Sequence, residues 1–193
     1  MVLKPSTPFT WASGWKSPIY CDNRLVLSYP EIRNYVADAF VTHIKESYPD
    51  VESISGVATG GIAQGALVAE RLGLPMTYVR SGKKSHGRQN QVEGVVKPGE
   101  KTVVIEDLIS TGGSSLTAVE ALKEKGANVM GLLAIFTYGF QASVDAFSQA
   151  GVPMATLSNY SLLIEEALAN NYVTQEQLGT LEKWRESPGE WQG

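Results

Sequence analysis

VVIEDLISTGGSS, residues 103–115, decides the fold of this 193-residue chain. An apolar run leads into two adjacent acids and then into small polar and glycine residues, and a helical pattern follows directly. The apolar run predicts a strand over Lys101–Glu106 that is covered on both faces. A helix is expected over Ser114–Lys125. Because ligands bind beyond the carboxyl ends of strands in open parallel sheets, the acids and the polar loop predict a binding site there.

The same alternation of short apolar runs and helical patterns extends in both directions. Strands are expected at Ser53–Ala58, Met76–Val79, Val129–Phe136 and 153–158, and helices from Pro30 to Pro49 and at Ile62–Leu72, 141–149, 160–169 and 174–185. The first helix should bury one face made of Ile32, Tyr35, Val36, Ala39, Phe40 and His43. Residues 1–28 are expected to be irregular. The pattern predicts an α/β fold with an open, mainly parallel twisted sheet flanked by helices.

Composition narrows the class of protein. Hydrophobic residues make up 43% of the chain and charged residues 19%, which is ordinary for a globular domain. The net charge of −4 argues against a general nucleic-acid binder, and the single cysteine, Cys21, argues against a disulfide framework or structural zinc. With no apolar run long enough for a membrane span and no signal-peptide core, we expect a soluble cytoplasmic protein without nucleic-acid or membrane partners.

Two further loops leave strands at the predicted binding edge. Ala58-Thr59-Gly60-Gly61 joins a strand to a helix, where paired glycines and free helix N–H groups favour an anion; a tight turn without a ligand is the alternative. Residues 80–90, RSGKKSHGRQN, carry four positive charges and no acid. This segment suits a lid over a polyanion, although a solvated loop would have the same composition.

The loop at 106–115 carries the most specific chemistry. Its carboxylates can hold sugar hydroxyls or a metal through water, and its N–H groups and hydroxyls can cradle a phosphate at the helix N-terminus. The loop lacks the Gly-Lys-Ser/Thr ending of a Walker A loop and is not a GxGxxG dinucleotide motif.

These loops resemble the type I phosphoribosyltransferases. Residues 103–115 resemble the family's phosphoribosyl pyrophosphate-binding motif. SGWKSPIYCDNR at 13–24 resembles the N-terminal motif of orotate phosphoribosyltransferases, and KSHG at 84–87 with NQVEG at 90–94 resembles their mobile catalytic loop. The resemblance implies one domain over residues 1–193, with a core at about 50–150 and a small hood built from about 1–30 and 153–185.

The resemblance also implies residue roles. Lys84, His86 and Asp107 are the implied catalytic residues, and Ser110, Lys16, Tyr20 and Arg24 are candidates for binding orotate. The set implied to bind phosphoribosyl pyrophosphate is Arg80, Lys84, His86, Glu106, Asp107, Leu108, Ile109, Ser110, Thr111, Gly112, Gly113, Ser114, Thr59, Gly60 and Gly61. An unusual non-proline peptide bond is expected in the loop at 59–61.

Three positions depart from the family pattern. Many relatives have lysine where this chain has Ala12, Gly60 and Ser81. These lysines serve orotate binding, the pyrophosphate loop and the mobile loop, so the departures leave the orotate pocket poorly defined.

The implied activity is transfer of ribose 5-phosphate from phosphoribosyl pyrophosphate to orotate in pyrimidine biosynthesis, with Mg²⁺ held through the donor and water near Glu106 and Asp107 rather than by direct protein ligands. The resemblance further implies a homodimer in which residues 80–90 cover the partner's site. A purine-type phosphoribosyltransferase would share the loop at 106–115 but lack the motifs at 13–24 and 84–86. A non-catalytic sensor of phosphoribosyl pyrophosphate is the alternative from another class.

Overall fold

The structure is a computed structural model that describes residues 2–4, 7–11, 14–82 and 91–191. The chain forms two compact units. One is Arg24–Leu157, and the other combines Met1–Asn23 with Ser158–Gly193.

A six-stranded sheet organises the larger unit, with strand order β10-β9-β8-β5-β6-β7. Its members are β5 (Ser53–Val57), β6 (Met76–Val79), β7 (Val92–Glu93), β8 (Lys101–Ile109), β9 (Asn128–Thr137) and β10 (Met154–Asn159). β5 pairs in parallel with β6 and β8, and β8 with β9, whereas β7 runs antiparallel to β6. The predicted open, mainly parallel sheet is therefore confirmed.

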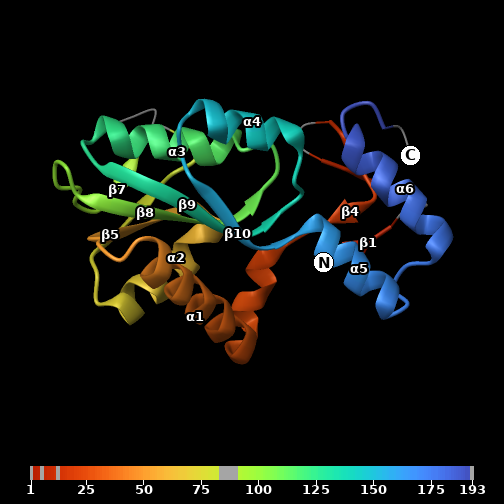
Figure 1. Ribbon diagram of the computed structural model, residues 1–193, viewed down its shortest axis with the longest axis horizontal. Helices are drawn as coiled ribbons and strands as arrows, with labels where there is room; N and C mark the ends of the chain where they lie inside the picture. Colours follow the sequence, from red (N-terminus) through yellow and green to blue (C-terminus); the bar gives the residue numbers. More distant parts are fainter. Residues whose placement is uncertain (1, 5–6, 12–13, 83–90, 192–193) are drawn as a thin grey trace. The chain divides into compact units, whose positions relative to one another are not determined.

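Helices cover both faces of this sheet (Figure 1). α1 (Pro30–Ser47) and α2 (Gly60–Leu72) lie on one face, and α3 (Gly113–Glu124) and α4 (Gln141–Gln149) lie on the other. Alternate residues of β8 serve the two layers: Val103 and Ile105 pack with α1 and α2, and Val104 packs with α3. This two-sided burial explains why the strand reads as a continuous apolar run.

Strand β8 is longer than the sequence predicts. It was expected to end at Glu106, but it continues to Ile109, with Glu106 opposite Ala134 and Leu108 opposite Phe136 on β9. Main-chain pairing does not depend on side-chain polarity, so the ladder runs through the two acids. Glu106 was predicted as the last residue of the strand and Asp107 as the residue after it, and both acids instead lie within β8 near its carboxyl end.

The buried face of α1 differs from the predicted stripe. Val36, Ala37, Phe40 and Ile44 are buried, so the stripe was right at two positions. It was wrong for Ile32 and Tyr35, which are 50% and 75% exposed. Hydrophobic periodicity fits more than one arc of a helix, and the arc that is buried depends on the neighbouring elements.

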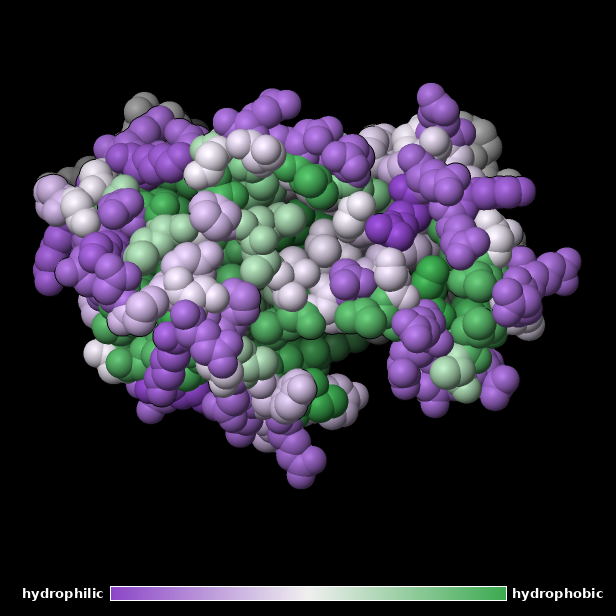
Figure 2. All heavy atoms as spheres, viewed as in Figure 1, coloured by the Kyte–Doolittle hydropathy of each residue, from purple (hydrophilic) through white to green (hydrophobic). Residues whose placement is uncertain are grey.

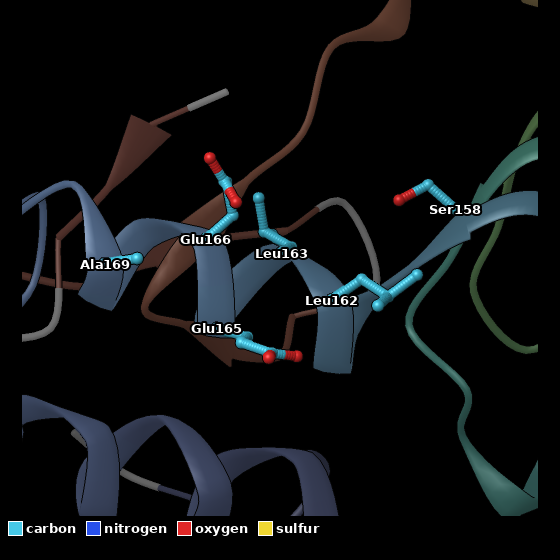
Figure 3. A pocket seen from close by; sticks show the side chains of 6 residues that line it. All are labelled: Ser158, Leu162, Leu163, Glu165, Glu166 and Ala169. Atoms are coloured by element: carbon cyan, nitrogen blue, oxygen red, sulfur yellow. The ribbon is translucent and has the colours of Figure 1, made fainter.

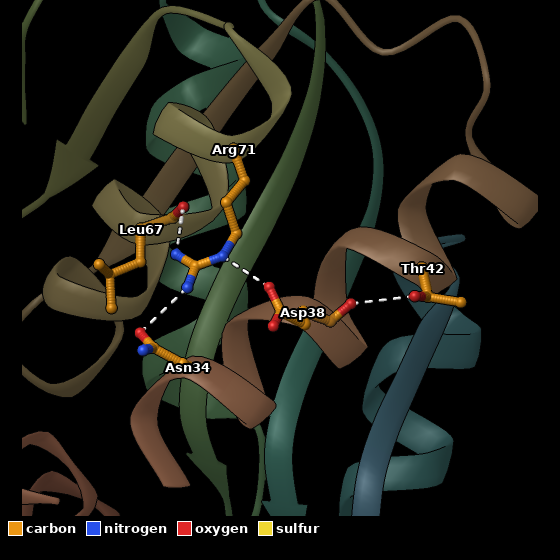
Figure 4. A network of polar contacts seen from close by, with 5 residues as sticks. All are labelled: Asn34, Asp38, Thr42, Leu67 and Arg71. Carbon is orange, nitrogen blue, oxygen red and sulfur yellow. Dashed lines mark hydrogen bonds and ion pairs between the residues drawn. The ribbon is translucent and has the colours of Figure 1, made fainter. Parts of the chain in front are cut away.

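Helix α2 supplies one such neighbour through Arg71 (Figure 4). The Arg71 guanidinium donates from Nε to Asp38 Oδ1 at 2.7 Å and from Nη2 to Asn34 Oδ1 at 3.1 Å, both on α1. It also donates from Nη1 to the Leu67 carbonyl oxygen at 3.1 Å. These contacts tie the polar edge of α1 to α2, the helix that begins at the predicted pyrophosphate loop.

The smaller unit contains short strand pairs and two helices. β1 (Val2–Leu3) pairs with β4 (Ile19–Tyr20), and β2 (Phe9–Thr10) pairs with β3 (Lys16–Ser17). The helices α5 (Tyr160–Ala169) and α6 (Gln175–Glu186) come after β10 in the chain. The prediction of an irregular segment at 1–28 was thus wrong, because these strands and the 3₁₀ helix Asn23–Ser28 fall within it. The predicted cap of α6 is present as a capping box between Thr174 and Gln177.

The core of this unit forms around Trp184 of α6, which is fully buried. Its Nε1–H donates to the Lys16 carbonyl oxygen at 2.9 Å, and its ring lies 5.5 Å from that of Tyr160. The Tyr160 hydroxyl donates to the Leu181 carbonyl oxygen at 3.0 Å. N-terminal and C-terminal segments therefore fold together. The role of a hood over the site stays a prediction.

The side of α3 and α4 that is seen in Figure 2 is largely polar. Figure 2 shows hydrophilic side chains over much of α3 and α4, as expected for helices that bury only one face. Within the described part of the chain, no helix has both the length and the apolar character to cross a membrane.

Candidate functional site

The two acids of the deciding stretch point to opposite layers of the sheet. Glu106 reaches Ser115 of α3, whereas the carboxyl group of Asp107 occupies the space where a Cβ on Gly60 of α2 would lie. This divergence follows from the alternation of side chains along a strand. The two adjacent carboxyl groups therefore lie in different environments, Glu106 beside α3 and Asp107 beside α2.

Glu106 is held inside the protein and is only 4% exposed. Its Oε1 accepts the Asp107 backbone N–H at 2.9 Å, and its Oε2 accepts the Ser115 hydroxyl at 3.1 Å. Burial raises the pKa of Glu106 to about 8, and the Asp107 carboxyl adds to the rise, while the Asp107 N–H and the Ser115 hydroxyl oppose it. Burial therefore disfavours the charged form of Glu106, whereas Asp107 is partly exposed.

The glycines of the Thr59–Gly61 loop allow the backbones of α2 and β8 to touch. A Cβ on Gly61 would meet the Ile105 carbonyl oxygen and, at 3.1 Å, the Glu106 Cα. The Ala58–Thr59 peptide bond is cis, in agreement with the unusual non-proline peptide expected here. Gly60, one of the three departures, lies where any side chain would displace the Asp107 carboxyl group.

Two helix N-termini meet at this edge of the sheet. α2 follows β5 and α3 follows β8, and these strands are neighbours. Neither helix has a hydrogen bond from a side-chain cap. Their first N–H groups lack intrahelical acceptors, so the edge offers two sets of donors to anions.

The loop from Ser110 to Gly112 connects β8 to α3. Gly112 has φ +85°, which favours glycine, and a Cβ there would also lie 2.9 Å from the Phe147 ring. Thr111, Gly113 and Ser114 are exposed, whereas Ile109 is 1% exposed and its side chain belongs to the core. Of the predicted phosphate-binding stretch, Ile109 can therefore offer only its backbone.

Arg80 lies at the stem of the basic segment. Its N–H donates to the Gln91 carbonyl oxygen at 2.9 Å, and the Gln91 side chain donates to the Arg80 carbonyl oxygen at 3.1 Å. Arg80 Nη1 lies 3.6 Å from Glu93 Oε1 on β7. The antiparallel β6–β7 pair thus closes the base of the segment, and Lys84 and His86 lie outside the described residues.

The orotate candidates are divided between the two units. Lys16 and Tyr20 belong to the smaller unit, and Arg24 begins the larger one. Lys16 Nζ donates to Thr10 Oγ1 at 3.1 Å, and the Tyr20 ring lies 5.7 Å from that of Phe9. Ser110 belongs to the larger unit and directly follows β8. Ala12 lies outside the described residues, and Ser81 is exposed.

Two surface hollows lie elsewhere. One of about 520 Å³ is in the smaller unit, where Leu162, Leu163, Glu165 and Glu166 of α5 line it with Ser158 and Ala169 (Figure 3). Another of about 390 Å³ is lined by Glu52, Pro75, Lys97, Pro98, Gly99 and Glu100, which precede β5, β6 and β8. It lies at the amino ends of these strands, away from the acids. No predicted site residue lines either hollow.

The side chains around Glu106 and Asp107 could supply only some of the ligands of a metal ion. Among the described residues, no group of three or more Asp, Glu, His or Cys side chains could hold a metal. The partly exposed Asp107 carboxyl group beside exposed hydroxyls fits Mg²⁺, an ion that commonly takes one or two protein carboxylates and completes its shell with phosphates and water.

Comparison with known proteins gives a consistent family. The model of the phosphoribosyl transferase domain matches residues 29–150, most of the larger unit. The orotate phosphoribosyltransferase of Cytophaga hutchinsonii is 59% identical over 189 residues, covering 98% of this chain and 90% of the relative.

Solved structures share the fold. The orotate phosphoribosyltransferase of Aeropyrum pernix superposes with a TM-score of 0.77 at 28% identity, over 86% of this chain and 92% of that protein. The UMP synthase of Leishmania donovani also gives a TM-score of 0.77, at 24% identity. The match covers 95% of this chain but only 38% of that protein, so it speaks for the fold alone.

Proposed function

The chain belongs to the phosphoribosyltransferases and within them to the orotate phosphoribosyltransferase family, and from this premise we propose the roles of its residues in transferring ribose 5-phosphate from phosphoribosyl pyrophosphate to orotate. The products are orotidine 5′-monophosphate and pyrophosphate. The observation that carries the assignment of roles is the acid pair at the end of β8, placed between the uncapped N-termini of α2 and α3.

The donor substrate fits this edge in two parts. The loop Ser110–Ser114 would receive the 5-phosphate through backbone N–H groups and hydroxyls at the start of α3. The loop Thr59–Gly61 would receive pyrophosphate oxygens at the start of α2. Asp107 lies between the two and would accept hydrogen bonds from the ribose hydroxyls, with Glu106 behind it.

The reaction breaks the bond between ribose C1 and pyrophosphate and develops positive charge on the ribose ring, as in other glycosyl transfers. Arg80, Lys84 and His86 would stabilise the departing pyrophosphate, and closure of the basic segment would exclude water that hydrolyses the donor. Mg²⁺, bound through the donor and water near the acid pair, would neutralise charge on the leaving group. Orotate carries its own acidic nitrogen, so no general base is assigned.

The direct test is the loss of orotate absorbance in the presence of phosphoribosyl pyrophosphate and Mg²⁺. Turnover with orotate and none with adenine, guanine or hypoxanthine is the expected result. Turnover with a purine base alone would instead favour a purine-type enzyme, and donor binding without any transfer would favour the sensor.

We also propose a homodimer in which residues 80–90 of one subunit serve the site of the other. The support is indirect: Arg80 and Gln91 are hydrogen-bonded to each other beside the edge strand β7, and the segment between them is long and basic in sequence. A cytoplasmic location, and the absence of membrane and nucleic-acid partners, stay predictions.

Mixing two inactive variants tests the shared site. Lys84→Ala and Asp107→Ala should each be inactive, and exchange of subunits should restore about a quarter of wild-type activity. Random pairing makes half of the dimers mixed, and each mixed dimer then holds one intact site and one doubly damaged site. If each segment serves its own subunit, no activity returns even when subunit exchange is demonstrated by mass spectrometry.

A further inference from the structure

Ser115 of α3 bonds directly to Glu106, the buried member of the acid pair on β8. It lies in the first turn of α3, just after the predicted phosphate loop, and is 1% exposed. The sequence assigns it no role, because a serine in a run of small polar residues is indistinguishable from its neighbours. Its hydrogen-bond partner is Glu106 on β8, and this contact arises from the packing of α3 against β8.

The hydrogen bonds form a short chain from α3 to the end of β8. Ser115 Oγ donates to Glu106 Oε2, and the other carboxyl oxygen of Glu106 accepts the Asp107 backbone N–H. The Ser115–Glu106 hydrogen bond is buried, and the hydrogen bond from the Asp107 N–H to Glu106 is partly buried. Glu106 itself is buried. Water therefore competes poorly for these groups, and loss of one partner leaves a buried acceptor unsatisfied.

We infer that Ser115 is a positioning residue of the transfer reaction: it fixes the Glu106 carboxyl group, which in turn fixes the backbone of Asp107 at the ribose. The inference rests on the proposed function of this edge. The two acids then have different tasks: the buried Glu106 fixes the position of the Asp107 backbone, and the partly exposed Asp107 contacts the ribose hydroxyls. The inference also links the helix that receives the 5-phosphate to the carboxylate that receives the ribose hydroxyls.

The hydrogen bond between Ser115 and Glu106 joins α3, which begins at the proposed phosphate loop, to β8, which carries Asp107. A displacement of about 1 Å in a positioning group can cost a large factor in rate. The ribose hydroxyls and the 5-phosphate belong to one covalently linked substrate, so their two binding groups must stay within the separation that its reactive conformation spans. A hydrogen bond between the elements that carry them provides that constraint.

The kinetic test compares Ser115→Ala with a matched control. Thr117→Val removes another hydroxyl from the same helix, one that bonds only to the Gly113 carbonyl oxygen at 2.9 Å on the exposed side. Ser115→Ala should lower kcat about tenfold, with KM for orotate changed less than about twofold, while Thr117→Val should match the wild type.

Glu106→Ala completes a double-mutant cycle. If Ser115 acts through Glu106, adding Ser115→Ala to Glu106→Ala should cost less than about twofold, because the carboxyl group that Ser115 positions is no longer present. Equal losses in both backgrounds would overturn the inference. Should Ser115→Ala fail to fold, Ser115→Cys keeps the buried volume with a weaker donor and serves in the same cycle.

Hydrogen exchange gives a readout that does not depend on turnover. The Asp107 amide should exchange about tenfold faster in Ser115→Ala than in the wild type or Thr117→Val, because Glu106 no longer holds it as firmly. Unchanged exchange at Asp107 would overturn the inference even if activity fell. Faster exchange in a protein that never turns over orotate would leave the positioning intact and count against the proposed function alone.

Discussion

Asp107→Asn will reduce kcat/KM for phosphoribosyl pyrophosphate by about 100- to 1,000-fold, the usual loss when one group that stabilises developing charge is removed. Asp107 is the partly exposed member of the acid pair, and its carboxyl group lies against Gly60 at the start of α2. Asparagine keeps the shape and loses the charge. Steady-state assays over donor concentration measure the change.

The fold should tolerate this substitution. Surface changes that leave packing intact usually shift the free energy of unfolding by under about 1 kcal/mol, so thermal melting should stay near wild type. Asp145→Asn is the matched control, since Asp145 is an exposed aspartate on α4 that accepts from Gln141 Nε2 at 2.8 Å, and it should keep full activity. Turnover of Asp107→Asn within twofold of wild type would remove Asp107 from the ribose-binding role.

Removal of divalent metal should have a comparably large effect. The donor is a polyanion and the protein carries a net charge of −4, so local cations and Mg²⁺ must offset the charge of the pyrophosphate. With excess EDTA we expect activity to fall at least about 100-fold, because the charge that develops on the leaving group is no longer neutralised. Orotate absorbance followed before and after chelation measures the loss.

Restoration identifies the ion as the cause. Adding Mg²⁺ beyond the chelator should return full activity, whereas an equal ionic strength of NaCl should not. Melting curves with and without EDTA should coincide, since the described residues offer no protein-only metal cluster. Full activity in EDTA would contradict the proposed role of Mg²⁺.

Local patterns in the sequence predicted much of this molecule. The apolar run before Glu106 required a strand covered on both faces, and the boundaries predicted for Met76–Val79 and for the helices at 141–149 and 160–169 agree with the structure. Turn glycines, helix periodicity and caps act within a few residues, so they can be recognised without knowing the neighbours. The long motif at 103–115 likewise pointed to the family.

Tertiary contacts decided what those patterns left open. Whether Ile32 and Tyr35 are buried depends on how α2 packs, and the end of β8 depends on its pairing with β9. The different positions of Glu106 and Asp107 follow from strand alternation, but the shift in the pKa of Glu106 comes from burial beneath α3. The sequence alone therefore determined that an acid pair and a loop of small polar residues meet at one edge of a parallel sheet. Only packing decided which acid is buried and held by Ser115 and which one is partly exposed, because burial and long-range hydrogen bonds are properties of elements that are distant in sequence.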